Sequence, residues 1–181
     1  MASDLRDLLR DAFSWTETEP DLFVSDRSGW WRDPQILEGL GPGLAALFPP
    51  EARPTVVVSP EVTGFLVGPL TARALGTGFV EAYRWGVRRP IAEPMTWAEV
   101  PADHRGDAQR LGVRTRLIGP EDRVLVVDDW ASTGAQARGL YDLMATLGAT
   151  VIGTAVIVDE CRPEISAELR MRGLLTEVDL S

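Results

Sequence analysis

The sequence contains a single cysteine and fewer basic than acidic residues, and each scarcity excludes a class of protein. Cys161 alone cannot form an intrachain disulfide or a multi-cysteine metal site, which is typical of a protein in a reducing compartment. The 18 basic residues against 27 acidic ones give a net charge of −9, which argues against nucleic-acid binding through a broad basic face. We therefore expect a cytoplasmic protein with no nucleic-acid partner.

Long apolar runs are missing too. None approaches the roughly 20 residues that cross a bilayer. Residues 1–13, MASDLRDLLRDAF, carry acidic side chains where a secretory signal has a basic segment followed by an apolar one. We expect neither export nor a membrane partner.

Two common phosphate-binding motifs are absent as well. A Walker-type loop is a glycine-rich turn that ends in Gly-Lys-Ser/Thr, and residues 130–136, WASTGAQ, contain no lysine. A dinucleotide fingerprint is missing after the first apolar strand, residues 55–59. The sequence therefore excludes a Walker-type nucleoside triphosphatase and leaves other phosphate sites open.

The chain of 181 residues is 45% hydrophobic, which suits one domain over residues 1–181 with a substantial core. Apolar runs alternate with segments of helical spacing. Strands are expected at 55–59, 78–84, 123–129 and 150–160, and helices at 5–12, 64–76, 135–147 and 162–173. This alternation predicts an α/β fold with a Rossmann-like parallel sheet flanked by helices. Residues 85–122, rich in proline and charge, predict a long functional loop or a hairpin.

The stretch VLVVDDWASTGAQA, residues 124–137, carries the clearest chemical signal. Asp128 and Asp129 end an apolar strand, and ligands of open α/β sheets bind at such strand ends. The small residues that follow can wrap an anion at the start of the next helix. The acids then accept hydrogen bonds from sugar hydroxyls or hold Mg²⁺ directly or through water. The pattern indicates a sugar-phosphate site; the alternative is that one acid caps the helix and the other is solvated.

Three segments resemble type I phosphoribosyltransferases. Residues 124–137 are similar to their phosphoribosyl diphosphate (PRPP) signature, with Thr133 and Gly134 at its centre and Ala135-Gln136 in place of the more usual Gly-Thr. Residues 56–80, which contain the run EVTGF, resemble the pyrophosphate loop of the adenine phosphoribosyltransferase branch, which reads Glu, two residues, Gly-Phe. Residues 23–34, FVSDRSGWWRDP, are similar to the N-terminal hood of that branch, here placed within residues 1–50.

The resemblance implies the fold of that family, with a hood and a long flexible loop, and an enzyme that transfers 5-phosphoribosyl from PRPP to a purine-like base. The resemblance further implies that pyrophosphate is released, that the enzyme requires Mg²⁺ and that the protein forms a homodimer. One alternative is a PRPP-binding regulatory module with little or no catalysis. Another is a structural α/β domain in which the acids only cap a helix.

The resemblance also implies site residues. Those expected at PRPP are Glu61, Val62, Thr63, Gly64, Arg84, Arg88, Asp128, Asp129, Ala131, Ser132, Thr133, Gly134, Ala135 and Gln136. Asp128 and Asp129 are also expected to hold the metal, directly or through water or PRPP. The base is expected to contact Val24, Ser25, Asp26 and Glu160.

The sequence departs from the family in several further places. Thr63 stands where the adenine enzymes usually carry a basic residue, so Arg88, Arg89 or Mg²⁺ compensates or the substrate differs. Ser25 replaces an arginine of the hood, and Trp130 is bulkier than the usual aliphatic residue. In the long loop, the place of a catalytic glutamate falls near His104, whose ordinary pKa suits proton transfer, and Asp103 and Glu99 are rival candidates.

Overall fold

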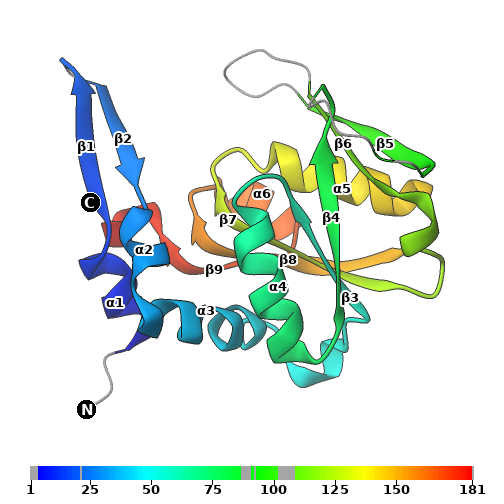
Figure 1. Ribbon diagram of the computed structural model, residues 1–181, viewed down its shortest axis with the longest axis horizontal. Coiled ribbons are helices and arrows are strands. Elements are labelled where there is room, and N and C mark those ends of the chain that lie inside the picture. The colour runs from blue at the N-terminus through cyan, green and yellow to red at the C-terminus, as the bar shows by residue number, and fades with distance from the viewer. Residues whose placement is uncertain (1–3, 21, 87–90, 92, 102–108, 181) are drawn as a thin grey trace.

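The computed structural model describes residues 4–20, 22–86, 91, 93–101 and 109–180. Seven strands form one sheet in the order β5-β6-β4-β3-β7-β8-β9 (Figure 1). The parallel strands are β3 (Val56–Pro60), β4 (Gly78–Arg84), β7 (Arg123–Ala131), β8 (Thr150–Asp159) and β9 (Met171–Thr176). The antiparallel edge is β5 (Met95–Val100) and β6 (Gln109–Arg114). The predicted α/β fold with a largely parallel sheet is confirmed.

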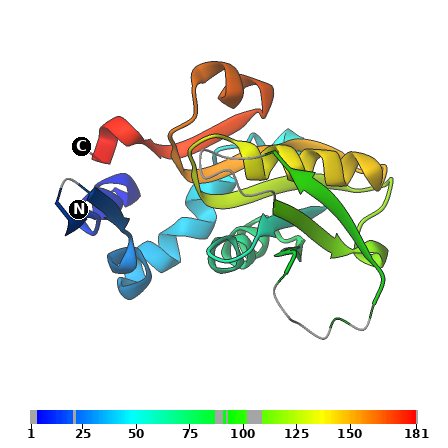
Figure 2. The ribbon, with the colours of Figure 1, turned by 90° about the horizontal axis from the view of Figure 1, so that it is seen from above.

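Helices cover both faces of the sheet (Figure 2). On one face lie α3 (Pro34–Ala45) and α4 (Gly64–Leu75), which pack on Val57, Leu125 and Val127. On the other lies α5 (Ala135–Thr146), which packs on the alternate side chains Val56, Val58, Val124 and Val126. Each fully buried aliphatic side chain contributes about 1.5–3 kcal/mol. The two cores hold the C-terminal ends of the central strands in fixed positions.

Local signals set the helix ends. Asp33 caps α3 by accepting a hydrogen bond from the Gln35 N–H at 2.7 Å, and Pro34 supplies the first helical φ angle. Gly76, with a φ of 68°, ends α4 in the left-handed region. α6 (Pro163–Glu168) is short and connects β8 to β9.

The hood is a small antiparallel hairpin beside the sheet, seen at the left of Figure 1. It consists of β1 (Ser14–Glu19) and β2 (Leu22–Asp26), supported by α1 (Leu5–Asp11) and α2 (Ser28–Arg32). Trp30 of α2 is fully buried, and its indole N–H donates to the Leu9 carbonyl at 2.8 Å. The Trp30 side chain therefore fastens α2 to α1 beneath the hairpin.

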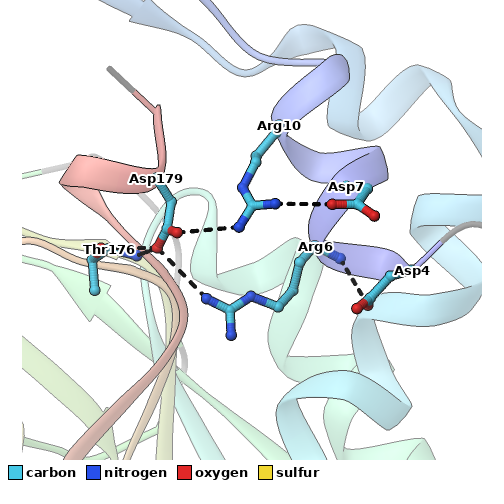
Figure 3. A network of polar contacts seen from close by, with 6 residues as sticks. All are labelled: Asp4, Arg6, Asp7, Arg10, Thr176 and Asp179. Atoms are coloured by element: carbon cyan, nitrogen blue, oxygen red, sulfur yellow. Dashed lines mark hydrogen bonds and ion pairs between the residues drawn. The ribbon is translucent and has the colours of Figure 1, made fainter.

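The C-terminal turn η3 (Glu177–Leu180) anchors the hood (Figure 3). The Asp179 carboxylate accepts hydrogen bonds from the Thr176 N–H at 2.7 Å and from Arg10 at 3.1 Å, and pairs with Arg6 at 3.6 Å. These bonds, first those from Thr176, lower the pKa of Asp179 to about 2. Trp15 of β1 also donates its indole N–H to the Leu180 carbonyl at 3.0 Å. The chain end thus holds both α1 and the hairpin.

One sequence-based expectation about secondary structure is wrong. The helix expected at 162–173 ends at Glu168, because Arg170 takes a φ of 43° and the chain re-enters the sheet as β9. The structure also contains β1, for which the sequence predicts no element, because its side chains are all exposed and show no apolar alternation. The long segment 85–122 does contain a hairpin, β5-β6, as one of its two expected forms. In the part of the chain that the structure describes, every helix is too short or too polar to cross a membrane.

Candidate active site

A pocket opens where β4 and β7 end and α5 begins, and a second, wider one continues from it under the hood. Both are lined by Arg84, Asp128, Trp130, Ser132 and Gln136. The first pocket also includes the whole loop from 131 to 136, and the second includes Glu61, Val62, Thr63 and Asp129. Most residues expected at PRPP thus surround one continuous depression.

The two acids at the end of β7 differ in their surroundings. Asp129 is buried, and its carboxylate forms an ion pair with Arg27 from the hood. Asp128 is half-buried and accepts the Asp129 backbone N–H at 2.9 Å. Burial raises the pKa of Asp128 well above its ordinary value of 3.8, and the negative charge of Asp129 raises it further. Without a ligand, the site therefore satisfies one acid with a cation and favours a proton on the other.

The loop after the acids presents small side chains to the pocket. Ser132 and Thr133 are exposed, and Gly134 begins α5 with a φ of 73°. A side chain at Gly134 would be strained, and its Cβ would lie 2.7 Å from Ile165 and 2.8 Å from Leu169. The glycine therefore keeps the loop tight against α6. The Ala135 N–H donates to Thr133 Oγ1 at 3.3 Å, and the dipole at the start of α5 favours an anion there.

Arg84 ends β4 and brings a cation to both pockets. Its backbone N–H donates to Glu61 Oε2 at 3.0 Å, and its Nη2 donates to Gln136 Oε1 at 3.2 Å. Its Nε is buried and has no hydrogen-bond partner within the described ranges. A buried donor without a partner is unusual and marks a place for an acceptor from a ligand. Gly64 lets the start of α4 lie close to the end of β3, since a Cβ there would lie 3.0 Å from both Ser59 and Pro60.

The hood and the end of β8 line the far side of the second pocket. Val24, Ser25 and Glu160, all expected at the base, lie there with Phe23 and Trp15. Asp26 does not line the pocket. It is exposed and accepts the Ser28 N–H at 2.8 Å, so it acts as a local turn residue at the start of α2.

Trp130 lies between the two parts of the site. Its indole N–H donates to Glu160 Oε2 at 2.6 Å, and its ring packs 6.0 Å from Phe13 and 6.3 Å from Trp15, centroid to centroid. Trp130 therefore both packs against the aromatic side chains near the hood and shapes the site.

Arg27 is the main site residue that sequence reasoning missed. The resemblance places an arginine before Asp26, where this chain has Ser25, yet Arg27 on the other side of Asp26 reaches the site. Its guanidinium lies 5.8 Å from the Trp130 ring centroid and pairs with Asp129. A basic residue next to the hood motif was the available signal.

Only some of the candidate site residues in the long segment 85–122 lie among the described residues. Glu99 lies on β5 with its exposed carboxylate 2.5 Å from Arg110, while its neighbours Val100 and Pro101 line the first pocket. Arg88, Arg89, Asp103 and His104 lie outside the described residues.

Comparison with known proteins identifies the family. No family model matches the chain. The adenine phosphoribosyltransferase of Synechococcus sp. (strain RCC307) is 31% identical over 165 residues, which cover 88% of this chain and 85% of that protein. The xanthine phosphoribosyltransferase of Lactobacillus delbrueckii subsp. bulgaricus is 32% identical over 130 residues, covering 71% of this chain and 67% of its own.

Solved structures agree on the fold. Adenine phosphoribosyltransferase from Giardia lamblia, in complex with 9-deazaadenine, superposes with a TM-score of 0.81 at 20% identity, covering 97% of this chain and 98% of that one. The enzyme from Trypanosoma brucei, in complex with AMP, pyrophosphate and ribose-5-phosphate, superposes with a TM-score of 0.79 at 20% identity. The match covers 99% of this chain and 83% of that one. Together with the paired acids, the small-residue loop and the hood, these likenesses show that the chain belongs to the type I phosphoribosyltransferase family, in its adenine phosphoribosyltransferase branch.

Proposed function

We propose that this protein transfers 5-phosphoribosyl from PRPP to a purine base with release of pyrophosphate. The observation that carries the proposal is the depression lined by Asp128, Asp129, the loop 131–136 and Arg84, whose buried Nε has no hydrogen-bond partner among the described residues. It offers acceptors for sugar hydroxyls beside donors for phosphates. Relatives named adenine and xanthine phosphoribosyltransferases support a purine as the acceptor.

PRPP binds with its 5′-phosphate in the loop 131–136, where backbone N–H groups and the hydroxyls of Ser132 and Thr133 donate to it. Its ribose hydroxyls donate to Asp128 and Asp129. Its pyrophosphate lies beside the turn from Glu61 to Gly64, and Arg84, which lines the same pocket and donates its backbone N–H to Glu61, supplies a cation there.

The acids suit a Mg²⁺ ion that arrives with PRPP. In the described part of the chain, no group of three or more His, Cys, Asp or Glu side chains could hold a metal alone. Mg²⁺ often keeps only one or two protein carboxylates and takes its other ligands from phosphates and water. Asp128 and Asp129 would hold it directly or through water. When bound, the ion neutralises charge on the departing pyrophosphate.

The residues of this chain promote transfer by position and charge. The loop 131–136 and the two acids fix the ribose phosphate, and Arg84 stabilises the negative charge that develops on pyrophosphate. Closure of the hood and the long connection excludes water from the electron-poor anomeric carbon. Arg88 is proposed to add a second cation, which would offset the neutral Thr63.

A proton must leave the base nitrogen as the new bond forms, and His104, Asp103 and Glu99 remain the candidates to accept it. Glu99 needs its ion pair with Arg110 to open first. Measuring the pH profile of kcat for H104A, D103N and E99Q would separate the three, since only loss of the true acceptor removes the corresponding ionisation from the profile.

The decisive test is pyrophosphate release from PRPP and Mg²⁺ across adenine, guanine, hypoxanthine and xanthine. We expect release that depends on one or more bases and falls at least about 100-fold in Asp129→Asn, as is typical for loss of a group that holds the reacting substrate. The exposed Glu38 of α3 gives the matched control, Glu38→Gln, which should retain activity. Absence of base-dependent release with every base would refute the enzyme.

A PRPP-binding regulatory module is the second candidate. It is favoured by the ion pair of Arg27 with Asp129, which occupies one acid, and by Thr63 in place of a basic residue. A module of this kind would bind PRPP with Mg²⁺ and shift its melting temperature, yet release no pyrophosphate with any base.

We further propose a homodimer in the cytoplasm with no nucleic-acid partner. Leu66 of α4 supports the dimer, because this large apolar side chain is 51% exposed. Light scattering of the purified protein tests the dimer. The net charge of −9 supports the absence of nucleic acid.

A further inference from the structure

Another recessed surface lies where the parallel strands begin, at the edge of the sheet opposite the candidate active site. Two neighbouring pockets share Phe48 and Pro49 in their linings. One follows the ends of α3 and α4 and includes Arg53, and the other follows the starts of β8 and β9 and includes Arg170 and Arg172. The two pockets together are called the basal groove below.

The basal groove is basic on a strongly acidic protein. Arg53, Arg170 and Arg172 are exposed, and none of them pairs with a carboxylate in the part of the chain that the structure describes. Glu51 belongs to the same connection between α3 and β3, yet it lines neither pocket. Because the whole chain has a net charge of −9, this face is a local positive patch that attracts an acidic ligand.

Contacts with backbone carbonyls and an aromatic ring hold two of these guanidinium groups at the groove. Arg172 Nη1 donates to the Leu47 carbonyl at 2.6 Å, and its guanidinium carbon lies 5.0 Å from the Phe48 ring centroid. Arg170 Nη1 donates to the Val151 carbonyl at 3.3 Å. None of the described residues accepts a hydrogen bond from the other guanidinium N–H groups of these two arginines, so those groups can donate to a ligand.

Two of the arginines hold a backbone conformation that suits glycine. Arg53 and Arg170 have φ angles of 42° and 43°, and they are the non-glycine residues with a positive φ in the described part of the chain. A side chain at such a φ strains the backbone, whereas glycine or asparagine adopts it more easily. The backbone therefore gains nothing from arginine at either position, which points to a use for the two side chains themselves.

An acidic peptide fits this surface better than a nucleic acid or a second copy of the chain. Apolar side chains such as Phe48, Leu75 and Met171 line the groove and can pack against apolar side chains of a peptide. A long nucleic acid would meet repulsion from the acidic remainder of the protein. Two facing copies of the groove would oppose arginine to arginine, and a groove docked on an acidic face of a second copy would build an open chain of molecules.

We propose that the basal groove docks an acidic peptide segment of a partner protein. The carboxylates of the peptide pair with Arg53, Arg170 and Arg172, and its apolar side chains pack on Phe48 and Pro49. Because the groove lies at the opposite end of the strands, a docked peptide leaves the candidate active site uncovered. The inference is therefore independent of the proposed function.

Fluorescence anisotropy on the whole protein tests the proposal. The probe is a fluorescein-labelled peptide of alternating glutamate and leucine, and a peptide of alternating glutamate and serine carries the same charge without the apolar side chains. We expect the glutamate-leucine peptide to bind at least about tenfold more tightly than the glutamate-serine peptide. Its affinity should also fall as the salt concentration is raised to about 0.5 M.

Asparagine at the two strained positions removes the charge and tolerates the left-handed φ. Arg53→Asn/Arg170→Asn should bind the glutamate-leucine peptide at least about tenfold more weakly than the wild type, with a melting temperature within about 3 °C of it. Arg32→Gln/Arg162→Gln removes the same charge at exposed arginines that line neither pocket, and should bind as the wild type does. If the asparagine variant does not fold, Arg53→Gly/Arg170→Gly serves the same test.

Several results would overturn the inference. Equal affinity for the two peptides would remove the apolar contacts, and unchanged binding by the asparagine variant would remove the arginines. Tighter binding of a single-stranded oligonucleotide than of the peptide, lost in that variant, would make the groove a nucleic-acid site. Self-association in light scattering that the variant abolishes would make the partner a second copy. Melting temperatures lowered by more than about 10 °C in both the asparagine and glycine variants would show that the arginines serve the fold.

Discussion

The substitution Asp128→Asn should stabilise the ligand-free protein while it weakens PRPP binding. Burial and the charge of Asp129 raise the pKa of Asp128 well above 3.8, so ionising Asp128 costs the native protein free energy. Asparagine keeps the Oδ1 that accepts the Asp129 N–H and removes the charge. The variant therefore lacks a destabilising group that the wild-type protein carries for function.

The sign and size of the effect follow from the protons that each state binds. Between 3.8, the ordinary value that applies to the unfolded chain, and the raised folded pKa, native Asp128 keeps a proton that the unfolded chain has released. Over that pH range the free energy of unfolding of the wild type falls by about 1.4 kcal/mol per pH unit relative to that of the variant. Above that range the difference between the two proteins is constant. One pH unit of the window corresponds to roughly 3–6 °C in melting temperature for a chain of this size.

Melting temperatures measured from pH 4 to pH 8 test this reasoning. The advantage of Asp128→Asn should be close to zero at pH 4, grow with pH and then level off, whereas Asp142→Asn, at an exposed site on α5, should match the wild type throughout. PRPP with Mg²⁺ should raise the melting temperature of the wild type more than that of Asp128→Asn. A variant that is no more stable than the wild type at any pH would refute the like-charge account.

Three further substitutions test other parts of the structure. Gly134→Ala places a side chain at a φ of 73° against Ile165 and Leu169, so thermal unfolding should show a loss of about 1–3 kcal/mol and PRPP should protect the variant less. Arg27→Gln leaves the buried Asp129 without its cation, and because Arg27 is 30% exposed we expect a loss of about 1–2 kcal/mol in urea unfolding at pH 7. Asp179→Asn should lower the free energy of unfolding by about 1 kcal/mol at pH 7. This figure is reduced for solvent screening, because the Asp179 side chain is 22% exposed. Because the folded pKa of Asp179 is depressed to about 2, that difference should vanish as urea unfolding is repeated from pH 4 down to pH 2.

The sequence predicted the parts of the fold that are fixed by burial. β3, β7 and β8 are runs of buried β-branched residues between helices, and such runs have few other solutions than a covered parallel sheet. It did not predict β1, which has no buried side chain, or β9, which follows a left-handed Arg170 that no local pattern signals.

Some residues of the candidate site could likewise be predicted from the sequence, and others could not. The loop 131–136 could be found because a phosphate site is a local property of one strand-loop-helix unit. Arg27 could not be placed, because its contact with Asp129 joins residues 102 positions apart and depends on how the hood packs. The role of Trp130 was equally hidden, since its partner Glu160 comes from the next strand.

The PRPP half and the base half of the candidate site are therefore held in place by different contacts. The acids and the phosphate loop continue from β7, whose side chains pack into cores on both faces of the sheet, so the PRPP half cannot shift without disturbing those cores. The base half faces a hairpin whose exposed strands are tied down by a few contacts, among them Trp15 to Leu180 and Arg27 to Asp129. If the hood and Glu160 contact the base as proposed, substitutions there are expected to change the base without weakening the hold on PRPP.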